Sequence, residues 1–266
     1  MLNQEEYLKI ELMLKEVFDN ALISKLMPYV VQTAEPRFTA LTLIEAKKSG
    51  LLDRESAEAN INVILQYPDP NVLRYAIGYL NQVGLLADER AQGNFDACVR
   101  HENPHELSRA ISVLYSSGLL ADEQGQQYFD ACAEHRHPFW LALVIDDLHS
   151  SGLLAGERAQ GNFDACRSYE NLNMLADILR VLRILRLLAG EHGQKNFDLC
   201  TSHHKPAELV YAVHNLHSSG LLAGEYGQLY FKACANHQHP FWLALVIDDL
   251  HPSGLLAGEQ GPKNFK

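Results

Sequence analysis

Hydrophobic and polar positions along the chain recur with a period of 34 residues. The triplet Gly-Leu-Leu marks this period, and its glycines are Gly50, Gly84, Gly118, Gly152, Gly220 and Gly254. Arg186 stands at the missing position, before the same Leu-Leu pair. One stretch, HPFWLALVIDDLH, occurs at residues 137–149 and again at 239–251, three periods later. Periods of roughly 20 to 50 residues are typical of solenoids and other repeat arrays, so the chain is predicted to be built from copied modules.

The part of each repeat that follows the glycine has the pattern of a first helix. An acidic residue recurs five positions after the glycine, as at Glu89 and Glu123, where we expect the first helical turn and where a carboxylate suits the helix dipole. A phenylalanine follows, and three residues later a cysteine; the cysteines are Cys98, Cys132, Cys166, Cys200 and Cys234. The i, i+3 spacing places both residues on one helix face, where cysteine acts as a small buried hydrophobe.

A proline interrupts this helix and predicts a second one. Asp69-Pro70 and Asn103-Pro104 have the order of an N-cap and a first helical residue, whereas the Lys and His of the other repeats are poor caps. The next glycine ends the second helix. With Gly84 at C′, Leu80 and Leu85 are the pair that meets in a Schellman cap.

Each repeat is therefore predicted to be two antiparallel helices, and the fold class to be all-α. Because one helix pair cannot bury both of its faces, the repeats should stack into a right-handed α-solenoid. We expect a capping helix in residues 1–15, a degenerate first repeat in 16–49, six repeats in 50–253 and a half repeat in 254–266, all in one array.

The 34-residue length and the two-helix design resemble tetratricopeptide repeats, although the residues depart from the W-x-x-L-G-x-x-Y pattern of that family. The combination of NFDAC, the proline and SGLLAGE is also similar to tandem helical repeats in effector proteins that intracellular bacteria secrete into host cells. The first resemblance implies an α-helical array. The second implies capture of a host or bacterial partner, with delivery to the host cytosol.

Composition and charge narrow the function classes. With 47% hydrophobic residues the chain can bury a core, and its net charge of −11 disfavours binding to nucleic acid or to an anionic membrane. The longest apolar run, residues 139–145, is much shorter than the roughly 18 residues of a membrane span. The N-terminal residues lack the pattern of a secretory signal, so we expect a cytoplasmic protein.

Two histidine patterns raise the question of a metal site. HENPH at residues 101–105 matches the H-E-x-x-H zinc signature, but that signature needs one uninterrupted helix and here the predicted break lies at Asn103-Pro104. A column of histidines, His101, His135, His203 and His237, is interpreted as bonding helix ends. We expect no metal, no cofactor and no catalytic residues, and Asp146, Asp147, Asp248 and Asp249 are expected on a solvated face.

Two departures from the repeat are candidate binding residues. Phe139-Trp140 and Phe241-Trp242 place large aromatic residues at the start of two second helices. Tryptophan is strongly enriched at binding hot spots, so these pairs are candidates for partner contact, and packing between neighbouring repeats is the alternative.

The other departure is a stripe of three arginines, Arg180, Arg183 and Arg186, in a repeat that lacks the usual proline and glycine. The stripe could receive an acidic peptide or a phosphate, or it could be a solvated face with local ion pairs. Without a glycine cap, the helix is expected to continue past position 186.

These features favour a non-enzymatic scaffold or adaptor that binds a partner protein or peptide. The alternative is a regulatory subunit that inhibits or positions a partner enzyme. A repeat-built enzyme is a third class, and it would require a deep pocket with strongly perturbed titratable groups.

Overall fold

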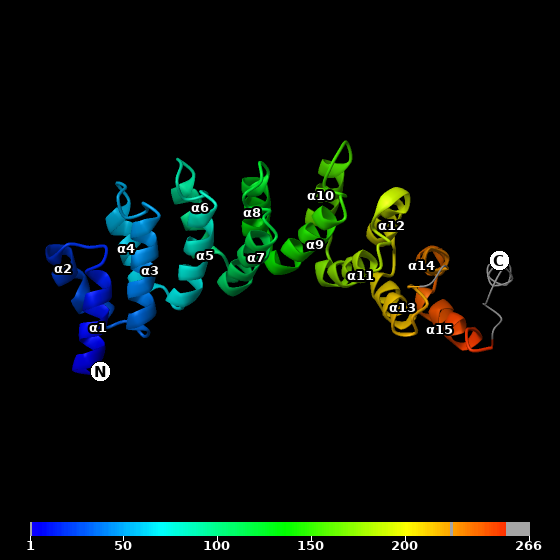
Figure 1. Cartoon of the computed structure of the whole chain (residues 1–266), viewed down its shortest axis with the longest axis horizontal. Helices are drawn as coiled ribbons and strands as arrows, with labels where there is room; N and C mark the ends of the chain where they lie inside the picture. Colours follow the sequence, from blue (N-terminus) through cyan, green and yellow to red (C-terminus); the bar gives the residue numbers. More distant parts are fainter. Residues whose placement is uncertain (1, 224–225, 254–266) are drawn as a thin grey trace. The chain divides into compact units, whose positions relative to one another are not determined.

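The computed structural model describes residues 2–223 and 226–253, and this part of the chain folds into helices with a spacing of about 34 residues (Figure 1). The chain consists of two compact units, residues 1–142 and residues 143–266. Each unit is built from paired helices, which confirms the all-α prediction. The predicted half repeat of residues 254–266 lies outside the described residues.

Two kinds of helix alternate along the chain after an N-terminal trio. The trio is α1 (Gln4–Leu14), α2 (Asn20–Val30) and α3 (Pro36–Lys48). The first helices of the repeats are α4 (Ala57–Gln66), α6 (Ala91–Arg100), α8 (Gly125–Glu134), α10 (Ala159–Arg167), α12 (Gly190–Ser202) and α14 (Gly227–Asn236). The second helices are α5 (Pro70–Gln82), α7 (Pro104–Ser116), α9 (Pro138–Ser150), α11 (Leu172–Ile184), α13 (Pro206–Ser218) and α15 (Pro240–Leu250).

Second helices pack on second helices, and this ladder organises each unit. In the first unit α1 packs on α3, α3 on α5 and α5 on α7; in the second unit α11 packs on α13 and α13 on α15. First helices contact the second helices beside them, as α6 does with α5 and α7. Within the units, α5 therefore lies between α3 and α7, and α13 lies between α11 and α15.

The predicted N-caps of the second helices are present. Asp69 Oδ1 accepts the N–H of Val72 at 3.1 Å, and Asn103 Oδ1 accepts the N–H of Glu106 at 3.3 Å. Lys205 makes no such bond, as expected for a poor cap. The acidic column lies one residue before the N-cap of the first helix at Glu89, Glu123 and Glu157, so its expected place in the first turn was wrong in these repeats.

The glycines end the second helices by adopting a left-handed backbone conformation. Gly84 has φ +80°, and the N–H of Leu85 donates to Leu80 O at 2.9 Å, which confirms the Schellman pair. Arg186 adopts the same left-handed conformation with φ +59°, and the N–H of Leu187 donates to Leu182 O at 2.8 Å. The expectation that the helix continues past 186 was wrong, because closure of the cap bond outweighs the backbone strain at an arginine.

The aromatic and cysteine columns form the interior of the first helices. Phe95, Phe129 and Phe197 are among the largest fully buried side chains, and all five cysteines are buried free thiols. Burial raises the pKa of the Cys98 thiol to about 12. These thiols are therefore protonated packing groups, as predicted.

Reciprocal amide pairs join consecutive first helices, and they were not foreseen from the sequence. Asn94 Nδ2 donates to Gln126 Oε1 at 3.0 Å, and Gln126 Nε2 donates back to Asn94 Oδ1 at 2.8 Å. The other pairs of this kind are Asn60–Gln92, Asn162–Gln194 and Asn196–Gln228. Each pair fixes the register between two neighbouring repeats of the same unit.

Within the described residues, no helix has the length and apolar character needed to cross a membrane.

Candidate functional site

The two copied phenylalanines pack against the preceding second helix. The guanidinium of Arg109, on α7, lies 3.6 Å from the ring centroid of Phe139, within cation–π range. Phe241 meets the ring of Tyr211, on α13, edge to face with centroids 6.0 Å apart. Both phenylalanines are half-buried. At these two positions the packing alternative is the one that the contacts favour.

The two copied tryptophans have different surroundings although their local sequences are identical. In each copy the ring centroids of the tryptophan and of the phenylalanine that precedes it are 5.4 Å apart. Trp140 is half-buried, whereas Trp242 is 62% exposed. Val246, one turn further along α15, is 51% exposed, and Asp249 is exposed as well. These three residues, at i, i+4 and i+7, share one helix face, which we call the α15 end face.

The three arginines of the stripe have different surroundings. Arg183 Nε lies 2.5 Å from Asp147 Oδ1 of α9, so this arginine is held in an ion pair between second helices. Arg186 is the C′ residue described above, and Arg180 is exposed. The structure therefore supports the local ion-pairing alternative for Arg183 and leaves Arg180 and Arg186 at the surface.

Asp147 is buried, so its expected place on a solvated face was wrong. Burial raises the pKa of this carboxyl to about 6, and the neighbouring Asp146 adds to the shift, while Arg183 opposes it. The ion pair thus offsets only part of the cost of removing the carboxylate from water. Asp249, at the equivalent position of α15, is exposed.

The histidine column caps helix ends. His101 follows α6, its Nδ1 accepts the N–H of Asn103 at 2.9 Å, and its Nε2 lies 3.2 Å from His135 O in the next repeat. The ring therefore links the start of α7 to the end of α8. His105 lies on α7 beyond the break, 3.4 Å from Asp69, so HENPH does not form one helix face. Among the described residues, no group of three His, Cys, Asp or Glu is placed to hold a metal ion.

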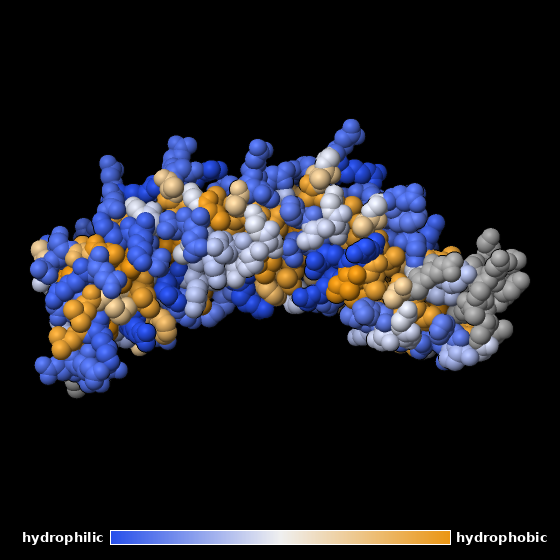
Figure 2. All heavy atoms as spheres, viewed as in Figure 1, coloured by the Kyte–Doolittle hydropathy of each residue, from blue (hydrophilic) through white to orange (hydrophobic). Residues whose placement is uncertain are grey.

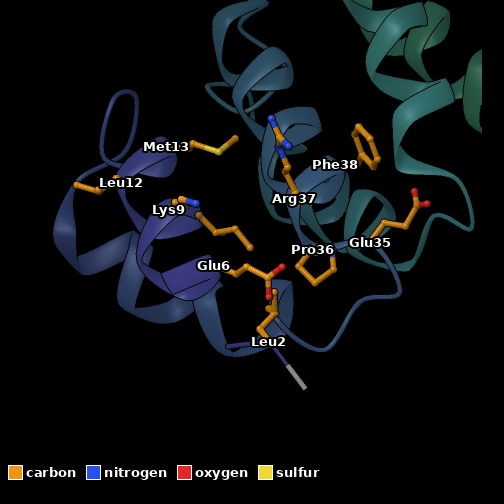
Figure 3. Close-up of a pocket in the computed structure, with 10 residues that line it drawn as sticks. Leu2, Glu6, Lys9, Leu12, Met13, Glu35, Pro36, Arg37 and Phe38 are labelled. Carbon is orange, nitrogen blue, oxygen red and sulfur yellow. The ribbon is translucent and has the colours of Figure 1, made fainter. Parts of the chain in front are cut away.

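A groove between α1 and the start of α3 has a volume of about 720 Å³ (Figure 3). The sequence analysis did not predict this groove. Its walls include Leu2, Glu6, Lys9, Met13, Pro36, Arg37 and Phe38. Acidic and basic groups both line it, so its charge does not select one ligand class.

Further aromatic and apolar side chains reach the surface on other helices. The ring centroids of Tyr79 on α5 and Tyr115 on α7 are 4.7 Å apart. Tyr75 stacks on Tyr79 with their centroids 6.4 Å apart. Figure 2 shows hydrophobic residues at the surface over α1 and over α11, where Leu12 and Ile184 are exposed. In the second unit, Tyr211 and Trp242 are the large exposed aromatic residues near the copied stretch.

Comparisons of the chain with protein-family models, with curated proteins and with solved structures found no match. What the structure itself shows is an all-α chain whose helices pack pairwise with a regular spacing of about 34 residues, the pattern of a helical repeat protein.

Proposed function

We propose that the chain is a non-enzymatic scaffold, a right-handed α-solenoid whose second helices bind a partner protein or peptide. The observation that carries the proposal is the exposed aromatic surface of α13 and α15. Trp242 and Tyr211 are 62% and 63% exposed, and the ring of Phe241 lies against Tyr211. A monomeric protein buries such side chains where it can, so exposed aromatic residues beside one another favour a binding surface.

The chemistry of the buried groups supports a binding role over an enzymatic one. Burial raises the pKa of the Cys98 and Cys234 thiols to about 12, which makes them poor nucleophiles. The raised pKa of Asp147 is explained by its burial, and its carboxylate faces Arg183 between two helices. Packing accounts for each of these perturbed groups.

Affinity capture from host-cell and bacterial lysates tests the proposal, with the intact chain compared with Trp242→Ala and Trp140→Ala variants. Because the two tryptophans lie in identical sequence, the half-buried Trp140 is the matched control. We expect a partner that is retained by Trp140→Ala and lost by Trp242→Ala, with both variants folded by circular dichroism.

Retention of every captured partner by a Trp242→Ala, Tyr211→Ala double variant would refute this assignment of the surface. A captured enzyme whose rate changes on binding would favour the regulatory-subunit alternative.

A further inference from the structure

Helix α5 lies inside the first unit, with α3 packed on one side and α7 on the other. It nevertheless keeps an open side, on which Tyr75 and Gln82 are exposed and Gly78 is half-buried. These three residues are spaced i, i+3 and i+7, so they share one helix face, which we call the α5 face. Both neighbouring helices are in place, and the α5 face still meets solvent.

Gly78 is a glycine that the fold itself does not require. It lies in the interior of α5, and a Cβ added to it would meet no atom within 4 Å, its sequence neighbours and the backbone of its own helix apart. Glycine in a helix interior is less favourable than alanine, because it loses more conformational freedom on folding. Glycine does suit a place where another backbone approaches closely. Gly78 thus leaves a notch in the α5 face that can admit the backbone of a bound segment.

Tyrosine rings lie beside this notch on α5 and on α7. Tyr75 stacks on Tyr79 with centroids 6.4 Å apart, and the ring of Tyr115 on α7 lies 4.7 Å from that of Tyr79. The Tyr115 hydroxyl donates to Gln82, which ties this ring to the α5 face. Tyr75 is 46% exposed. Tyrosine supplies a large, rigid contact area at low cost in conformational entropy, as binding surfaces require.

Charge is divided unequally between the two kinds of helix in the first unit. The ladder helices α3, α5 and α7 contain five basic and two acidic residues, namely Arg37, Lys47, Lys48, Arg74 and Arg109, with Glu45 and Glu106. The first helices α4, α6 and α8 contain one basic and four acidic residues, namely Arg100, with Glu58, Asp96, Asp130 and Glu134. In a chain of net charge −11, the ladder helices of this unit are therefore its basic part.

The arginines beside the α5 face are not neutralised by carboxylates. The ion pairs that the ladder helices already make are Lys47–Asp53, Lys48–Glu45 and His105–Asp69. In the part of the chain that the structure describes, neither Arg74 nor Arg109 forms an ion pair. Their guanidinium groups lie instead on aromatic rings, 4.4 Å from the centroid of Tyr75 and 3.6 Å from that of Phe139. Glu106, in the first turn of α7, is half-buried and pairs with neither arginine.

We infer that the α5 face binds an extended acidic segment of a partner protein, whose backbone passes over Gly78 and whose carboxylates pair with Arg74 and Arg109. Charge complementarity selects this partner, because the unpaired charges at the surface are positive. The inference rests on the proposed binding role of the second helices and adds a surface in the first unit. A nucleic acid is disfavoured, since a long polyanion would also meet the field of a chain with net charge −11.

The probe comes from a randomised peptide library that is selected on the immobilised intact chain. The enriched peptide is then labelled, and its binding is followed by fluorescence anisotropy. We expect enriched sequences rich in aspartate and glutamate, and an affinity that falls about tenfold in Gly78→Ala and in Arg109→Gln. Gly78→Ala should also raise the Tm by about 2 °C, because alanine favours the helix. Weaker binding by a more stable variant separates contact with the peptide from unfolding.

Two variants on the first helix α6 are matched controls. Gly93 is also open to an added Cβ, so Gly93→Ala makes the same chemical change away from the α5 face. Arg100→Gln removes an exposed positive charge that pairs with Asp96 at 3.1 Å. Both controls should leave the affinity for the peptide unchanged.

Enriched peptides without an excess of acidic residues would overturn the inference, as would a library that yields no enriched sequence. So would an affinity that Gly78→Ala and Arg109→Gln lower no more than their controls do. A single-stranded oligonucleotide that binds with the same dependence on Gly78 and Arg109 would replace the peptide with a nucleic acid. If the selection fails while affinity capture still depends on Trp242 or Tyr211, the scaffold proposal stands and only the assignment of the α5 face is wrong.

Discussion

Asn94 and Gln126 exchange two amide hydrogen bonds, at 3.0 Å and 2.8 Å, across the boundary between two repeats. Asn94 also donates to Leu85 O at 2.8 Å, so its buried amide ties the loop before its own helix to the next repeat. Because both partners are amides, each donor finds an acceptor without a charge being buried.

Asn94→Ala should lower the free energy of unfolding by about 2 kcal/mol, because it leaves the Gln126 amide and the Leu85 carbonyl without their partner. Urea denaturation followed by circular dichroism measures this. Asn236→Ala is the control, since Asn236 is exposed and its side chain donates to Lys232 O of its own helix at 2.7 Å. Equal effects of the two variants would contradict a special role for the amide pairs.

Asp147→Asn should stabilise the protein at neutral pH. The pKa of Asp147 is raised to about 6 in the folded state, so the folded state binds the proton more tightly than the unfolded chain. The contribution of this group to the free energy of unfolding is fully present at pH values below its ordinary pKa. It is lost as the pH rises through about 6.

The asparagine variant cannot ionise and keeps an oxygen acceptor for Arg183. We expect its advantage in free energy of unfolding to be about 1 to 3 kcal/mol at pH 7.5 and to disappear near pH 4. Urea titrations at three pH values measure it, with Asp249→Asn as the exposed control. A difference between variant and parent that does not change with pH would show that the burial of Asp147 does not perturb its ionisation.

Arg186→Gly should raise the free energy of unfolding by about 1 kcal/mol, because glycine adopts the left-handed conformation without steric cost. The reverse change, Gly84→Ala at φ +80°, should lower it by a similar amount. Thermal denaturation of both variants measures the shifts. If Arg186→Gly is neutral or destabilising, the arginine side chain contributes a contact that offsets its backbone strain.

The five cysteines should be unreactive toward a thiol reagent at pH 8 in the folded protein and should all react after unfolding. Burial raises the pKa of each thiol, so little thiolate is present and little surface is accessible. Counting labelled thiols by mass spectrometry with and without guanidinium checks this. Rapid modification of one cysteine in the folded chain would reveal local opening of its repeat.

Much of the fold could be predicted from periodicity. The 34-residue columns located both helices of each repeat, and Asp69-Pro70 and Gly84 marked the ends of the second helix through local backbone chemistry. The prediction at Arg186 failed because a single residue's preference is weaker than the cap bonds of the whole helix end. The Asn94–Gln126 pair was missed because its two members lie 32 residues apart and look like ordinary polar positions.

The candidate site was only partly predictable. The printed residues already show what α9 and α15 contain, that each helix begins at a proline, and that Phe and Trp are adjacent at its start. It could not determine that Val144 and Asp147 are buried while Val246 and Asp249 are exposed, because the two stretches are identical. Helical conformation depends on neighbours within a few residues, whereas burial depends on which other helices lie against the surface. The difference comes from tertiary packing, in which Arg183 of α11 lies against Asp147 of α9.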